Sequence, residues 1–266
     1  MKESNSYVLL EQEGHLISSC LSVGLTALRK AHVLNKGEFY IALFNLSVGL
    51  ERLMKATVIV DCLVSTGNAP TKAQLKNYGH DIRGLYGACV ALGAKYGANI
   101  EPLGSLSVID QNILQVLNDF AHTTRYHNLD GLSGAAKYTD PLECWNAVLF
   151  RIIEKDVSPR TISKTIVVAE AMAGAIKDKT LVSMTDLNKN SMSLEQVLAV
   201  PGLHDQAVRY AVLRLINIIS PIRDLIAERS SVAFYGDFGS LSPLMGEFLE
   251  WLWNDRGYVL RKKRWP

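Results

Sequence analysis

The side chains with the greatest chemical potential lie close together in the middle of the chain. Residues 119–130 read Asp-Phe-Ala-His-Thr-Thr-Arg-Tyr-His-Asn-Leu-Asp and contain two of the six histidines. Histidine can give or take a proton near neutral pH, and arginine can hold a phosphate in a fork of N–H groups. Arg125, His122 and His127 are therefore candidates for metal-free RNA cleavage, in which the 2′-hydroxyl of the RNA is the nucleophile.

The spacing of these residues places them at the end of a helix. Asp119, His122 and Arg125 follow at intervals of three and would share one helix face, with His127 and Asp130 just beyond the helix end. A purely structural role is the alternative, because Arg and protonated His are favoured where a helix leaves its last carbonyl groups unpaired. A metal site within this segment is disfavoured, since one polar segment seldom supplies a whole coordination shell. We predict no metal.

A second polar cluster lies where another helix should begin. It reads Tyr-Gly-His-Asp-Ile-Arg over residues 78–83. Asp81 suits a helix N-terminus, so helix capping is the structural alternative for this cluster. Together with the polar residues around Arg125, it completes the set of candidate ligand-binding residues: His80, Asp81, Arg83, Tyr126, Asn128 and Asp130.

The elements that must position these residues are predicted to be helices. Apolar residues recur at helical spacing, and Gly, Pro and polar runs separate the helical segments. We expect helices over about 7–34, 38–64, 80–96, 106–124, 141–155, 159–177, 194–200, 203–229 and 240–253. Residues 178–193 read as an exposed loop, Pro201-Gly202 as a helix break and 257–260 as a short extended piece. The fold class is all-α.

Composition excludes several classes of protein. The 266 residues are 48% hydrophobic and 20% charged, with a net charge of +2, which excludes a mainly disordered chain. No apolar stretch is long enough for a transmembrane helix, and the acidic residues before the first apolar stretch do not fit a signal peptide. The four cysteines are far apart and form no Cys-x-x-Cys pair, which favours reduced thiols in a cytoplasmic protein.

Common catalytic motifs are missing from the sequence. It contains no phosphate-binding loop of the Gly-x-x-x-x-Gly-Lys-Ser/Thr type, no dinucleotide-binding glycine fingerprint, no His-Glu-x-x-His and no Gly-x-Ser-x-Gly. The usual hydrolase, kinase and dehydrogenase interpretations therefore have no support in the sequence, and we predict no cofactor.

Three segments in the first half of the chain resemble a known family. Residues 44–55 carry Glu51 four residues before Lys55, residues 79–82 read Gly-His-Asp-Ile, and residues 124–130 read Thr-Arg-Tyr-His-Asn-Leu-Asp. In this order they resemble the HEPN superfamily over residues 8–155. The resemblance implies an up-and-down bundle of four or five helices, a homodimer, and work on RNA or nucleotides, often in toxin–antitoxin or phage-defence systems.

The resemblance also bears on catalysis. Catalytic HEPN members carry an Arg followed by four to six residues and a His, which faces a twin across the dimer. Here His127 follows Arg125 too closely, and His122 precedes it. We therefore expect a protein that binds RNA or a nucleotide through Arg125, His127, His122 and His80. The alternatives are a catalytically inactive scaffold for a protein partner and, third, a metal-free RNase with a displaced Arg/His pair.

We divide the chain into a HEPN-like bundle, residues 1–157, and a helical extension of unknown type, residues 158–266, which can pack on the first as one domain. The chain ends in Arg-Lys-Lys-Arg-Trp-Pro, close to further aromatic residues. Such a tail could bind phosphate and bases. A solvated chain end with tryptophans packed on the bundle is favoured over that role, because charge elsewhere is balanced.

Overall fold

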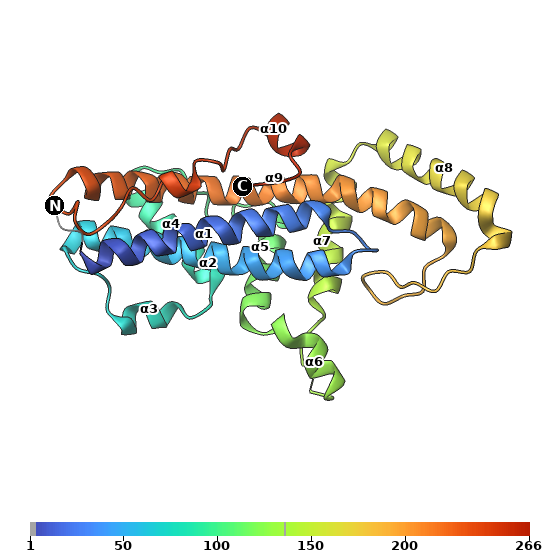
Figure 1. The fold of residues 1–266 in the computed structure, drawn as a ribbon, viewed down its shortest axis with the longest axis horizontal. Helices are drawn as coiled ribbons and strands as arrows, with labels where there is room; N and C mark the ends of the chain where they lie inside the picture. Colours follow the sequence, from blue (N-terminus) through green and yellow to red (C-terminus); the bar gives the residue numbers. More distant parts are fainter. Residues whose placement is uncertain (1–3, 136) are drawn as a thin grey trace.

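The computed structural model describes residues 4–135 and 137–266, and they form an all-helical bundle (Figure 1). The α-helices are α1 (Asn5–Lys30), α2 (Lys36–Thr66), α3 (Lys72–Tyr78), α4 (Ile82–Tyr96), α5 (Val108–His122), α6 (His127–Leu132), α7 (Pro141–Asp156), α8 (Pro159–Ile176), α9 (Leu194–Tyr235) and α10 (Arg256–Arg261). Short 3-10 turns lie at η1 (Thr124–Tyr126), η2 (Lys177–Lys179) and η3 (Glu247–Leu249). Within the described residues the β-pairing is confined to one isolated bridge between Thr185 and Ser191.

The helical hairpin of α1 and α2 packs unusually closely. A Cβ atom at Gly24 of α1 would lie 2.7 Å from Leu46 Cγ, and one at Gly49 of α2 would lie 2.9 Å from Leu21 Cδ2. Any larger residue at these two positions would push the helices apart. Gly67 ends α2 in the left-handed conformation, with φ of 71°, which glycine adopts without steric cost.

Helix α9 is the longest element and joins the two halves of the chain in one core. It packs against α1, α2, α7, α8 and α10, and Figure 1 shows it beside α1 and α2 along the long axis of the molecule. Leu215 and Ile219 of α9 are fully buried in the same core as Leu46 and Leu53 of α2. The segment 158–266 thus contributes one of the three long helices of the bundle.

The predicted break at Pro201-Gly202 is wrong, because α9 runs through both residues. A proline costs about 3 kcal/mol inside a helix. Here apolar residues on both sides of the proline pack on the common core, Val197 and Val200 before it and Ala207 after it. Packing on both flanks therefore outweighs the local preference of the proline.

Other predicted boundaries near the C-terminus also need correction. The expected helix over 240–253 is replaced by turns and η3. The expected extended piece at 257–260 lies inside α10, because the Asp255 side chain accepts a hydrogen bond from Tyr258 N and caps the helix. The helices α3 and α6 lie in segments where the sequence pattern predicts none. Trp265 is buried, with its backbone N–H bonded to Thr26 Oγ1.

Within the described residues, no helix combines the length and apolar character that a membrane span needs. The candidate site residues lie where α4 and α5 pack on α2 and where the start of α7 borders the end of α5. Helix α5 packs on α2, α4 and α7, and Figure 1 shows α5 and α7 running at a steep angle to the three long helices. The C-terminal end of α5 is thereby brought to the surface of α2.

Candidate functional site

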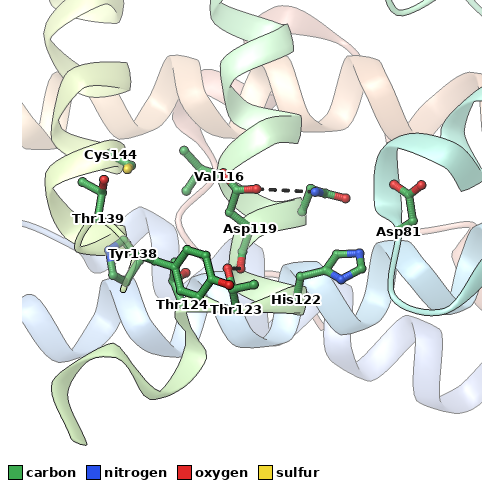
Figure 2. A pocket seen from close by; sticks show the side chains of 11 residues that line it. Asp81, Val116, Asp119, His122, Thr123, Thr124, Tyr138, Thr139 and Cys144 are labelled. Carbon is green, nitrogen blue, oxygen red and sulfur yellow. Dashed lines mark hydrogen bonds between the residues drawn. The ribbon is translucent and has the colours of Figure 1, made fainter. Parts of the chain in front are cut away.

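The first part of the site is a cavity of about 580 Å³ at the C-terminal end of α5 (Figure 2). Its walls come from the start of α4, the end of α5, the loop before α7 and the start of α7 itself. The polar residues that line it include Asp81, Asp119, His122, Thr124 and Tyr138. The cavity falls within the range of about 300–1,000 Å³ that is typical of small-molecule sites. We call it the α5 cavity.

The second part is a groove of about 400 Å³ that runs along α1 and α2. Two further residues complete it from elsewhere in the chain, His80 before α4 and Arg125 in η1. The charged side chains that line it are Glu13, Glu51, Arg52, Lys55 and Arg125. Three cationic side chains thus face two acidic ones, before His80 is counted. We call it the Arg125 groove.

Glu51 organises one end of the Arg125 groove. Its carboxylate accepts a hydrogen bond from Lys55 Nζ at 2.7 Å and lies 3.1 Å from His80 Nδ1. Lys55 Nζ also donates to the backbone carbonyl of Gly79 at 2.6 Å, which ties the loop before α4 to α2. Because a carboxylate only accepts, Nδ1 of His80 carries the proton in this contact, and Nε2 is the ring nitrogen left for a ligand. The His80 side chain is 61% exposed.

Two histidines meet where the Arg125 groove borders the α5 cavity. The ring centroids of His80 and His122 lie 6.4 Å apart, with the rings nearly perpendicular at 87°. His80 lines the groove, and His122 lines the cavity. The two hollows are therefore neighbours, with the two histidine rings between them.

Arg125 is the cation in the groove that no acid neutralises. Its guanidinium carbon lies 5.2 Å from the centre of the Phe44 ring, a cation–π contact that holds the side chain against α2. Its Nε is buried and has no hydrogen-bond partner in the part of the chain that the structure describes. Among the described residues its guanidinium makes no ion pair, whereas Arg52 is paired with Glu13 at 2.8 Å. An anion in the groove would supply the missing partner.

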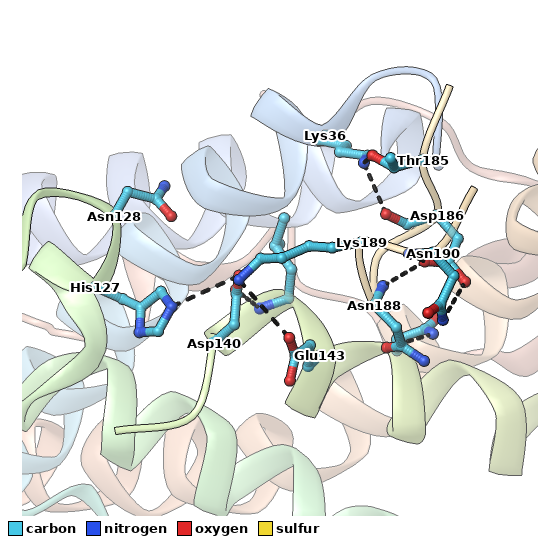
Figure 3. Close-up of polar contacts among 12 residues, drawn as sticks. Lys36, His127, Asn128, Asp140, Glu143, Thr185, Asp186, Asn188, Lys189 and Asn190 are labelled. Atoms are coloured by element: carbon cyan, nitrogen blue, oxygen red, sulfur yellow. Dashed lines mark hydrogen bonds and ion pairs between the residues drawn. The ribbon is translucent and has the colours of Figure 1, made fainter. Parts of the chain in front are cut away.

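The structure separates His127 from this site. His127 lies at the start of α6 and lines neither hollow. Its Nε2 is 3.8 Å from the buried carboxylate of Asp140, which also pairs with Lys189 Nζ at 2.9 Å (Figure 3). The 3-10 turn η1 changes the helical progression between Arg125 and His127. The two residues therefore do not form the pair that the sequence suggests.

The other predicted residues divide between the site and its surroundings. Asp81 lines the α5 cavity and also caps α4 by accepting from Gly84 N at 2.9 Å. The Arg83 guanidinium donates to Gln115 Oε1 on α5, and Asn128 Nδ2 donates to the Tyr40 hydroxyl at 2.9 Å. Tyr126 and Asp130 line neither hollow.

Some residues of the site escape sequence reasoning. Thr124 and Tyr138 belong to no spacing pattern that would mark them as site residues. Glu13 and Arg52 are 39 residues apart in the sequence and form a pair only because α1 packs on α2. Cys144 also lines the α5 cavity. Burial, followed by the charges of Asp119 and Glu143, raises the pKa of its thiol, so Cys144 is a neutral wall residue rather than a nucleophile.

Among the described residues, no group of three or more His, Cys, Asp or Glu side chains could hold a metal ion. Comparisons of the chain with protein-family models, curated proteins and solved structures found no match.

Proposed function

We propose that the Arg125 groove binds the phosphate groups of RNA or of a nucleotide. The observation that carries the proposal is Arg125 itself, whose Nε is buried without a partner in a groove where every acidic side chain already contacts a basic one. A phosphate oxygen can accept from Arg125, and also from Nε2 of His80 when the ring carries a proton on both nitrogens. The excess of positive charge in the groove favours an anionic ligand.

The resemblance to HEPN proteins supports the same proposal. The three segments that carry it are far apart in the sequence, yet Glu51, Lys55, His80 and Arg125 all line the groove. We propose on this basis that the N-terminal half is HEPN-like. The homodimer and the toxin–antitoxin or phage-defence setting that the resemblance implies stay predictions.

Two other functions have specific observations in their favour. A scaffold for a protein partner fits α8, which exposes Val167, Val168 and Met172 to solvent. Metal-free RNA cleavage fits the contact between His80 and His122, which brings two proton-transfer groups together at the border of the groove that Arg125 lines. RNA cleavage would require the same groove to bind RNA first.

The proposal predicts salt-dependent binding of single-stranded RNA. We expect a fluorescein-labelled RNA octamer to bind the pure protein at 50 mM salt, as followed by fluorescence anisotropy without metal. The slope of log affinity against log salt should be about −0.7 or steeper, because each phosphate neutralised on a single strand contributes about −0.7 and Arg125 is the groove cation that no described acid neutralises. Gel analysis of the same mixtures shows whether the RNA is cleaved. No binding at 50 mM salt would contradict the proposal and favour the scaffold.

A further inference from the structure

The α5 cavity lies next to the Arg125 groove, because Thr124 lines the cavity and the next residue, Arg125, lines the groove. The two hollows are also neighbours where the rings of His122 and His80 are in contact. A nucleotide whose phosphate lies beside Arg125 would therefore place its sugar and base toward the cavity. The inference below rests on the proposed phosphate groove and names the base that the cavity takes.

The floor of the cavity contains a polar atom that lacks a partner. Thr124 is only 5% exposed, and its Oγ1 has no hydrogen-bond partner among the described residues. Buried side-chain polar atoms are bonded in the large majority of cases, and the cost of leaving one unpaired is about 1–3 kcal/mol. A ligand that reaches Thr124 would remove this cost. The orphan hydroxyl therefore points to a polar ligand rather than an apolar one.

The Asp119 carboxylate is held in place with acceptor capacity to spare. Its Oδ1 accepts from Gln115 Nε2 at 2.7 Å and from Asn118 Nδ2 at 3.5 Å. The dashed line in Figure 2 marks the second of these contacts. The Arg83 guanidinium bonds to Gln115 Oε1 and so fixes the Gln115 amide. No described cation pairs with Asp119, and its Oδ2 has no partner among the hydrogen bonds of the described residues. A ligand that offers N–H donors fits this wall.

Tyr138 supplies an aromatic surface for the same cavity. It lies in the loop before α7 and is 54% exposed, so its ring is open to a partner. Unpaired RNA bases are typically recognised by stacking on aromatic side chains and by hydrogen bonds along the base edge. A cavity with an aromatic side chain and a carboxylate meets both requirements.

The pattern of hydrogen-bond donors on each RNA base decides which base fits the cavity. A carboxylate can only accept, and it accepts best from two adjacent donors. Guanine places two N–H donors side by side, on N1 and on the 2-amino group. Adenine, cytosine and uracil each set an acceptor beside the donor that would meet Asp119. We propose that the α5 cavity binds a guanine base, with Asp119 accepting from its N1 and 2-amino groups, Tyr138 stacking on the ring and Thr124 bonding a further polar atom.

The test compares three RNA octamers of uridine that differ only in one central base: guanine, hypoxanthine or adenine. Hypoxanthine keeps the N1 donor of guanine and lacks the 2-amino group. We expect the guanine octamer to bind about tenfold more tightly than the adenine one, which corresponds to about 1.4 kcal/mol and lies in the range of a bidentate base contact. The hypoxanthine octamer should fall between them.

The variant Asp119→Asn should lower the affinity for guanine to the level of adenine or below, because an amide oxygen and amide nitrogen cannot both accept from guanine. It should not weaken the binding of the adenine octamer, because an asparagine amide can pair with adenine. The matched control is Asp178→Asn, because Asp178 is an exposed aspartate in η2 that lines neither hollow. Equal binding of all three octamers to the wild type would overturn the guanine inference and leave the phosphate groove standing. So would an equal loss for all three in the Asp119→Asn variant. Failure of every octamer to bind would overturn both.

Discussion

Replacement of Arg125 by alanine is expected to weaken the binding of single-stranded RNA at least tenfold at 50 mM salt. A hydrogen bond to a charged group contributes about 1.5–3 kcal/mol, and the Arg125 guanidinium is the one in the groove that no acid neutralises. Arg125→Lys should recover part of the loss, because lysine keeps the charge but not the planar fork. The measurement is anisotropy of the labelled octamer, with thermal unfolding to confirm that each variant is folded.

Two matched variants show whether the effect belongs to the site. Arg160→Ala removes the same charge from an exposed position at the start of α8, and His127→Ala removes the histidine that contacts Asp140 outside the groove. Both should bind RNA within about twofold of the wild type. Neither residue lines the groove, and the long-range effect of the exposed Arg160 charge is largely screened. A larger loss in His127→Ala than in Arg125→Ala would show that the sequence-based pair, and not the groove, contacts RNA.

Replacement of Arg229 by methionine is expected to lower the free energy of unfolding by about 3 kcal/mol. Arg229 of α9 and Asp61 of α2 have side chains only 9% and 11% exposed, with Nε and Oδ1 3.2 Å apart. The Arg229 guanidinium also stacks 3.8 Å from the centre of the Tyr96 ring. Removal of one partner of a buried ion pair typically costs about 3–5 kcal/mol, because the other charge stays buried. Lys95 Nζ lies 3.8 Å from the Asp61 carboxylate and would neutralise part of its charge in the variant. We therefore expect a loss at the lower end of this range of free energies.

Urea unfolding at pH 7 measures this effect, and two further variants interpret it. The double variant Asp61→Leu with Arg229→Met should regain most of the loss, since it leaves no unpaired charge in the core. Arg52→Met breaks the more exposed pair with Glu13, in which both side chains are 38% exposed, and should cost less than about 1 kcal/mol. If Arg229→Met cost no more than Arg52→Met, α9 would not be joined to α2 as closely as the structure has it.

The sequence predicts a helix correctly where a regular apolar period and a capping residue at the boundary indicate the same segment. Val108–His122 and Pro141–Asp156 are examples, because each has a capping side chain, Ser107 or Asp140, and a regular apolar stripe. It fails where tertiary packing overrides a local signal, as at Pro201 in α9. It also fails at α10, since six residues are too few to show a helical period.

The candidate site is predictable in part. The two histidine-containing segments can be recognised from their residue types, and the structure brings His80, His122 and Arg125 together. The position of His127 depends on the 3-10 turn η1, which shifts its side chain toward Asp140. A regular helical projection cannot show that shift. The same holds for Thr124, whose orphan hydroxyl exists only because the surrounding elements bury it.

The histidine side chains offer the most direct test of where RNA binds. The chain has six of them, His15, His32, His80, His122, His127 and His204, and each gives its own imidazole signal in a ¹H–¹³C NMR spectrum, assigned by single His→Gln variants. On titration with the uridine octamer that carries one guanosine, the signals of His80 and His122 should shift in parallel with RNA saturation, while those of His127 and the buried His204 stay in place. Shifts at His127 with none at His80 and His122 would contradict the phosphate-binding groove.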